Sequence, residues 1–153
     1  MRRAVALIAV AATTAALFGL VGASASTTSH HRQERNVRLV VANGYSVDND
    51  PSGQSGGDLF GASGDLRGPG DRAGKWSSAC TLSPPVGGQC QVTLIWDYRD
   101  RIQLAGNFRV QAEHNRLAIV GGTGKFRRAQ GVATIQAAND QGTVQHVHLT
   151  TLR

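Results

Sequence analysis

The stretch "IVGGTGKFRR", residues 119–128, places three glycines, a threonine and a lysine directly after an apolar run. Such a loop either holds a phosphate or turns the chain between two strands. A phosphate-binding P-loop needs a glycine five positions before its Gly-Lys pair and a Ser or Thr after that pair. Ile119 and Phe126 stand at those positions. The dinucleotide pattern G-x-G-x-x-G fails as well, because Arg127 replaces its third glycine. The loop is therefore predicted to be a turn between strands, and no nucleotide cofactor is expected.

The chain around this loop alternates between strand-like runs and turn signals. Apolar residues recur at every second position in several runs, and clusters of Gly, Pro, Asn and Asp separate the runs. No stretch after residue 25 shows a convincing helical period. The predicted fold class is all-β, either a sandwich or an up-and-down barrel. The expected strands are 37–47, 58–67, 75–82, 89–98, 102–111, 116–120, 132–137 and 143–152.

The scarcity of aromatic residues bears on the interior of such a barrel. An eight-stranded barrel encloses just enough space for side chains or for one small ligand. Aromatic residues make up only 5% of the sequence. We interpret this as favouring an interior with room over a core packed solid by large side chains.

The N-terminus is typical of an export signal. A basic head (residues 1–3) precedes an apolar run (4–22) and the cleavage signature Ala23-Ser24-Ala25. An uncleaved membrane anchor is the alternative, since the apolar run is long enough to span a bilayer. We expect a signal peptide over 1–25, a flexible tail over 26–35 and a single domain over 36–153. The protein would then be secreted, without stable membrane insertion after cleavage.

The charge pattern argues against a nucleic-acid partner. Residues 26–153 carry 14 basic and 10 acidic side chains, a net charge of +4. Nucleic-acid binders concentrate such charge on one helix or face with interleaved aromatic residues. Here the arginines are spread along the chain, which we interpret as a solvated surface that keeps the protein soluble.

The two cysteines, Cys80 and Cys90, flank the turn-rich segment "TLSPPVGGQ". A hairpin centred on Pro85 places Cys80 opposite Cys90. In an exported protein an even number of cysteines indicates a disulfide. We therefore expect a Cys80–Cys90 bond, with two buried free thiols as the alternative, and no zinc site.

Several longer stretches resemble the dirigent proteins and the allene oxide cyclases, which share one fold. The most specific is "LAIVGGTGKFRRAQGVATIQ" (117–136); "GGDLFGASGDLR" (56–67), "DNDP" (48–51) and "GTVQHVHLTTL" (142–152) resemble further elements of that fold. The resemblance covers roughly residues 37–152 and implies an eight-stranded antiparallel up-and-down β-barrel. In such a barrel the glycine-rich loop is architectural: its glycines permit positive φ angles and close approach, Phe126 plugs an end, and the Thr123 hydroxyl fastens the loop.

The resemblance also implies a cofactor-independent function. Such barrels bind a reactive intermediate and dictate how it closes or couples, through proximity, orientation and exclusion of water. The acid before the proline of the family motif corresponds to Asp50, and Arg127 keeps the position after the phenylalanine. Asn49 replaces the first acid of the family's Asp-Asp pair, and Gln130 replaces an arginine. The pocket thus departs from the plant pattern for phenoxy-radical coupling.

His146 and His148 lie two residues apart on an expected strand, so both face the same side. If they point into the barrel, either is a candidate general acid or base. A metal site would need a third ligand, which the sequence does not offer at a telling spacing. The ionisable candidates are Asp50, Arg109, Arg127, His146 and His148. Whether these side chains point into the barrel decides between two functions. The first is a cyclase or stereocontrolling enzyme acting on a small hydrophobic intermediate, and the second is a lipocalin-like binder; a homo-oligomer remains open.

Overall fold

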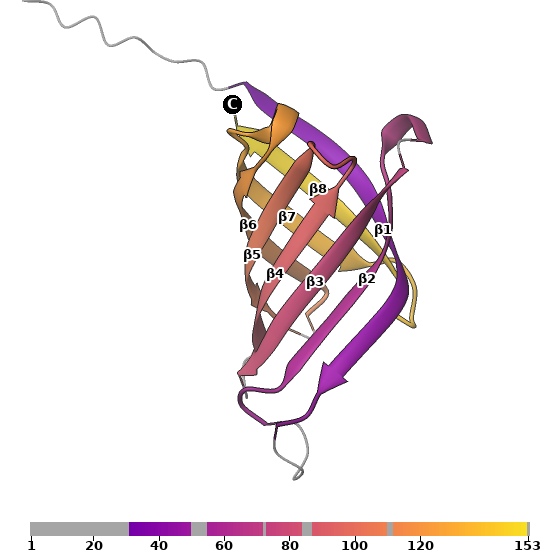
Figure 1. Ribbon diagram of the computed structural model, residues 1–153, viewed down its shortest axis with the longest axis vertical. Helices are drawn as coiled ribbons and strands as arrows, with labels where there is room; N and C mark the ends of the chain where they lie inside the picture. Colours follow the sequence, from indigo (N-terminus) through magenta and orange to yellow (C-terminus); the bar gives the residue numbers. More distant parts are fainter. Residues whose placement is uncertain (1–30, 50–54, 72, 84–86, 110–111, 153) are drawn as a thin grey trace, which may run out of the picture.

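The computed structural model describes residues 31–49, 55–71, 73–83, 87–109 and 112–152, which form a closed eight-stranded antiparallel barrel (Figure 1). The barrel closes because β1 pairs with β8, which excludes the sandwich. The leader and most of the expected tail lie outside the described residues. The strands are β1 (Arg32–Val47), β2 (Leu59–Arg67), β3 (Ala73–Ser83), β4 (Gly87–Ile95), β5 (Arg101–Phe108), β6 (His114–Gly122), β7 (Gln130–Ala137) and β8 (Val144–Leu152).

β1 begins four residues before the expected domain boundary. Residues 32–35 were expected in the flexible tail, but Arg32 and Arg35 pair with Leu152 and Leu149 of β8. The polar character of this segment suggested a tail, whereas the closing strand β8 supplies it with a hydrogen-bonding edge. No helix among the described residues is long and apolar enough to cross a membrane.

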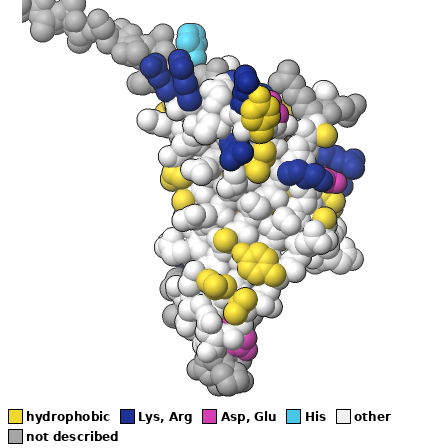
Figure 2. Space-filling view, viewed as in Figure 1, with side chains coloured by type: hydrophobic (Ala, Val, Ile, Leu, Met, Phe, Trp, Pro, Cys, Tyr) yellow, Lys and Arg dark blue, Asp and Glu magenta, His cyan; other side chains and the backbone are white. Residues whose placement is uncertain are grey.

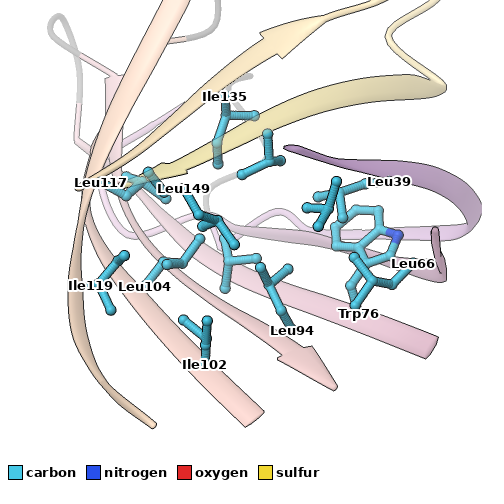
Figure 3. Packing of buried hydrophobic residues seen from close by; sticks show 14 of the residues in the cluster. Leu39, Leu66, Trp76, Leu94, Ile102, Leu104, Leu117, Ile119, Ile135 and Leu149 are labelled. Atoms are coloured by element: carbon cyan, nitrogen blue, oxygen red, sulfur yellow. The ribbon is translucent and has the colours of Figure 1, made fainter. Parts of the chain in front are cut away.

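The barrel interior is built by the period-2 alternation of each strand. Apolar side chains at every second position point inward and pack into one cluster (Figure 3). Leu66, Leu94 and Ile102 are completely buried in it. Their side chains fill one half of the barrel.

The two ends of the barrel differ. The plugged end carries the β2–β3, β4–β5 and β6–β7 connections, with the short 3-10 helices η1 (Pro69–Asp71) and η2 (Gly124–Phe126), at the top of Figure 1. The cavity end carries the other four connections between consecutive strands. Phe126 is only 2% exposed, and its ring centroid lies 4.8 Å from that of Trp96. Phe126 therefore plugs the barrel as expected.

The glycine-rich loop is shaped by two of its three glycines. Gly124 has φ +57°, and a Cβ there would lie 2.3 Å from Asp100 Oδ1. A Cβ on Gly122 would lie 2.5 Å from the Phe126 carbonyl oxygen. Gly121 has no positive φ, and no atom within 4 Å would oppose a Cβ added there. A positive φ therefore explains the glycine only at position 124. The Thr123 hydroxyl donates a hydrogen bond to the carbonyl of Arg99, which confirms that it fastens the loop.

Candidate functional site

A cavity of about 150 Å³ lies inside the barrel towards the cavity end. Apolar side chains from seven of the eight strands surround it. The lining residue from β5 is Phe108, which ends that strand and lies next to the β5–β6 connection. The lining residues are Leu39, Phe60, Gly61, Ala62, Trp76, Ser78, Cys80, Cys90, Val92, Phe108, Leu117, Ile135 and Gln145.

Three aromatic side chains frame this cavity. The Trp76 indole N–H donates a hydrogen bond to the Val40 carbonyl at 3.1 Å, which fixes the ring against the wall. The rings of Phe60 and Phe108 contact each other across the cavity end with centroids 6.3 Å apart. Such rigid rings offer a large apolar contact area to a planar molecule.

The disulfide forms part of the same wall. Cys80 and Cys90 are register partners on β3 and β4, and they are bonded as expected. Both are buried and line the cavity. The bond ties the two strands where the β3–β4 hairpin reaches the cavity end.

Ser78 and Gln145 supply the polar side chains of the lining. The Ser78 hydroxyl accepts a hydrogen bond from the Ala62 N–H at 3.0 Å and lies 3.3 Å from the Ala62 carbonyl. Its hydrogen-bonding capacity is thus used by the wall. Gln145 retains an amide that offers both a donor and an acceptor. None of the described lining residues is ionisable.

Asp58 organises the connection between β1 and β2 at the cavity end. Its carboxylate accepts hydrogen bonds from the Ser55 N–H at 2.7 Å and the Asn49 N–H at 3.0 Å. The Ser55 hydroxyl donates a further bond. These donors stabilise the ionised form and lower the pKa of Asp58 below its usual value, the Ser55 N–H first. Asp58 is therefore a loop-forming anion and not a proton donor.

The ionisable candidates from the sequence do not meet inside the barrel. Arg109, Arg127 and His146 are exposed, and His148 is half-buried on the outer face of β8. The placement of the two histidines follows from the alternation of β8, because Val147 and Leu149 point inward. Asp50 lies outside the described residues.

The histidine pair makes surface contacts. His148 Nδ1 lies 2.7 Å from the Asn36 side-chain oxygen. In the part of the chain that the structure describes, no group of three or more His, Cys, Asp or Glu side chains could hold a metal ion. The direction of the pair, which the sequence left open, is outward for both His146 and His148.

The sequence carries a family signature in its C-terminal part. Residues 92–152 match the family model described as dirigent-like protein. This span runs from β4 to β8 and includes the glycine-rich loop. The described barrel is similar in fold to the dirigent-like proteins. The resemblance noted from residues 117–136 is thus confirmed.

Solved structures share the fold of this dirigent-like barrel at low sequence identity. A pyocyanin demethylase aligns with a TM-score of 0.66 and 20% identity, over 78% of this chain and 100% of that chain. A pterocarpan synthase dirigent protein aligns with a TM-score of 0.58 and 18% identity, over 81% and 88%. A Diels-Alderase from Streptomyces koyangensis aligns with a TM-score of 0.56 and 14% identity, over 84% and 72%. No protein of curated function matches the sequence.

Sequence reasoning missed most of the residues that line the dirigent-like cavity. The lining residues Phe60, Ser78 and Gln145 were not expected from the sequence. Alternation held the missing signal, because Gln145 shares its strand face with Val147 and Leu149. Tyr98, which shares a period with Trp96, lies outside and is 72% exposed, because the turn between β4 and β5 ends the strand before it.

Proposed function

We propose that this dirigent-like barrel binds a small, largely apolar molecule in its cavity and directs how that molecule closes a ring. The observation that carries the proposal is the cavity of about 150 Å³ framed by Phe60, Trp76 and Phe108. A dry apolar cavity of roughly 150 Å³ accepts a molecule of the size of benzene. The cavity would thus enclose one reacting ring, with larger substituents extending past the Phe60–Phe108 pair.

Confinement is the chemistry that such a lining supplies. None of the described lining residues is ionisable, so what these residues supply is a wall that holds reacting atoms near their bonding geometry and excludes water. The Gln145 amide could orient one polar substituent of the substrate. A ring closure without proton transfer needs nothing more. The Diels-Alderase and a cyclase that catalyses a [4 + 2] cycloaddition, both structural neighbours, support this reaction class.

A non-catalytic, lipocalin-like binder is the second candidate. The observation that favours it is the same uncharged lining, because storage or transport of an apolar molecule needs only burial. Both candidates require the cavity to hold a ligand, and they differ in what happens to that ligand.

A third version of the proposal uses acid catalysis by Asp50. Asp50 lies between β1 and β2 in the sequence and corresponds to the family acid before a proline. In this version Asp50→Asn lowers the rate by roughly a hundredfold with folding intact. If the Asp50→Asn variant reacts at the wild-type rate, or loses activity only because it unfolds, Asp50 is not the catalytic acid. Arg127 and His146 are exposed and His148 is half-buried on the outer face of β8, so this version of the proposal assigns the acid role to Asp50 alone.

We also propose that the protein works outside the cytoplasm after removal of residues 1–25. The Cys80–Cys90 disulfide supports this, because such bonds persist in oxidising compartments. N-terminal sequencing of the protein from the culture medium tests it, and an uncleaved, cell-retained protein would contradict it.

Ligand entry is tested by the two tryptophans, of which only Trp76 lines the cavity. Toluene added to ¹⁵N-labelled mature protein should shift the Trp76 indole N–H resonance and saturate. Ala62→Phe, which fills the cavity, should abolish the shift. Ala118→Phe adds the same ring on the exposed face of β6 and should leave the shift unchanged. An unmoved Trp76 resonance in the wild-type protein would overturn cavity binding.

Catalysis and storage separate on the fate of the natural ligand. Mass spectrometry of the denatured protein, purified from its own source, should release a molecule that Ala62→Phe does not retain. An enzyme converts an added linear precursor of that molecule faster than buffer does and with one stereochemical outcome. A binder returns the precursor unchanged.

A further inference from the structure

A second cleft, of about 390 Å³, lies at the plugged end of the barrel. It is formed by β1, the connection around η1 and the end of β4, and it shares no lining residue with the cavity described above. The completely buried side chains of Leu66, Leu94 and Ile102, which line neither space, fill the barrel interior. The cleft is lined by Arg35, Val37, Gly68, Pro69, Gly70 and Trp96.

Arg35 is the only ionisable side chain among those described around this cleft. It follows the same alternation on β1 as Val37 and Leu39, which point into the barrel. Its guanidinium carbon lies 5.4 Å from the centroid of the Phe126 ring. The side chain is half-buried, so its charge is held against the aromatic plug rather than extended into water.

Lys125 provides a direct comparison, because its ammonium lies 5.0 Å from the centroid of the same Phe126 ring. Lys125 forms an ion pair with Asp100, whose carboxylate also accepts its backbone N–H at 3.0 Å. Arg35 forms neither an ion pair nor a side-chain hydrogen bond with any described residue; its nearest acidic neighbour in sequence, Glu34, pairs with Arg32 at 2.7 Å. The charge of Lys125 is therefore neutralised by Asp100, whereas the Arg35 guanidinium keeps its five N–H donors for a ligand.

The surroundings of the cleft attract anions. Most described Lys and Arg side chains lie in the plugged half, where Figure 2 shows them gathered on the upper part of the visible face. The described acids are divided between the two ends, with Asp48, Asp58, Glu113 and Asp140 at the cavity end and Glu34, Asp65, Asp71, Asp97 and Asp100 in the plugged half. The plugged half therefore keeps a net positive charge and the cavity end a net negative one. This separation of charge raises the local concentration of anions at the cleft and lowers it at the cavity.

We propose that this cleft is a second binding site, for a planar organic anion such as an aromatic carboxylate. The guanidinium of Arg35 presents a rigid fork that matches a carboxylate in two parallel hydrogen bonds. Trp96 and Pro69 provide flat apolar walls for the ring. The cleft has more than twice the volume of the cavity inside the barrel, so a two-ring molecule fits the cleft and a single ring fits the cavity. The inference is independent of what the inner cavity binds.

The two tryptophans separate the sites in one experiment, because Trp96 lines the cleft and Trp76 lines the cavity. 2-Naphthoate added to ¹⁵N-labelled mature protein should shift the Trp96 indole N–H resonance to saturation and leave Trp76 in place. The uncharged 2-naphthamide should bind at least roughly tenfold more weakly, since it cannot form charge-assisted bonds. A shift confined to Trp76, or equal binding of the amide, would overturn the proposal.

Three variants test the role of Arg35. Arg35→Gln should weaken 2-naphthoate binding by roughly tenfold or more, and Arg35→Lys should weaken it by less, because a point charge remains without the fork. Arg99→Gln is the matched control, because it removes the same charge from the same half of the barrel. The Arg99 guanidinium carbon lies 5.0 Å from the centroid of the exposed Tyr98 ring. An unchanged Trp76 resonance verifies the fold of each variant. Equal losses in Arg35→Gln and Arg99→Gln would show a diffuse charge effect and overturn the site.

Discussion

The plugged end and the cavity end of this barrel are completed by different interactions. At the plugged end, two turns are fastened by polar bonds, from the Thr123 hydroxyl to Arg99 and from the Lys125 N–H to Asp100, above the buried ring of Phe126. At the cavity end, a disulfide joins two strands and aromatic side chains surround a space that they do not fill.

The difference follows from the size of the inward-facing residues. Large side chains such as Leu66 and Leu94 occupy the interior of the plugged half and are completely buried. Ala62 and Ser78 occupy inward positions in the other half and line the cavity. Packing at one end thus stabilises the barrel, and small residues at the other end leave room for a ligand. Four changes should break or sharpen this comparison.

The largest effect is expected from Phe126→Ala at the plugged end. Removing a buried aromatic ring costs about 3–5 kcal/mol, because contacts are lost and a cavity remains. Urea unfolding of the variant measures this free energy. Tyr98→Ala removes a ring of similar size that is 72% exposed and should change stability by less than about 0.5 kcal/mol. Equal effects of the two variants would mean that Phe126 is no plug.

Loss of the disulfide should come next. Replacing Cys80 and Cys90 by serine removes a cross-link between residues ten apart in sequence. Closing so short a loop contributes on the order of 2–3 kcal/mol to the free energy of unfolding. Unfolding with and without reductant measures the contribution in the wild-type protein. Toluene binding should weaken as well, since both sulfurs line the cavity, whereas 2-naphthoate binding should persist.

Gly124→Ala and Gly121→Ala test the loop that decides the fold. The first should cost about 2 kcal/mol, because a left-handed alanine is unfavourable by roughly 1–2 kcal/mol and its Cβ meets Asp100. The second places a Cβ with no atom within 4 Å and should be nearly neutral. Thermal unfolding of the pair gives the difference. Similar losses would show that the whole loop, and not the contact at Gly124, is sensitive.

The smallest effect concerns Asp58 at the cavity end and Asp65 in the plugged half. Backbone N–H donors, Ser55 first, lower the pKa of Asp58, and the Lys75 hydrogen bond and charge lower that of Asp65. Because both pKa values lie below the unfolded value of 3.8, each carboxylate stabilises the fold above that pH, and the stabilisation disappears as the pH falls through the folded pKa.

Salt should distinguish the two carboxylates. The exposed Asp65–Lys75 pair is screened at 1 M salt, whereas the hydrogen bonds to Asp58 are not. Asp65→Asn should therefore reduce the loss of stability as the pH falls towards and below 3.8 only at low salt, and Asp58→Asn should reduce it at both salt concentrations. A salt-independent effect of Asp65→Asn would contradict the assignment.

Much of this fold follows from local pattern. All eight expected strands exist, and the Cys80–Cys90 hairpin has the expected register. The clusters of turn residues also predicted the β4–β5 connection, where Asp97 accepts hydrogen bonds from the Arg99 and Asp100 N–H groups. The outward direction of His146 and His148 was also within reach, since Val147 and Leu149 alternate with them.

The candidate sites depended on long-range contacts. Arg35 seemed to belong to a polar tail, and only the pairing of β1 with β8 directs it to the cleft beside Trp96. Phe60 and Phe108 are 48 positions apart in sequence, yet their rings meet at 6.3 Å. No periodicity within one strand reveals such a pair.

The sequence alone determined the all-β class, the number of strands, the disulfide and the loop at residues 119–128 as a turn. These features depend on period-2 alternation, turn residues and contacts across about ten positions, which short stretches encode. Only the tertiary structure decided where β8 closes against β1, which end is plugged and where the cavity and the cleft lie. Those features arise where distant strands meet, because the space left inside a barrel depends on the combined volume of side chains from all of them.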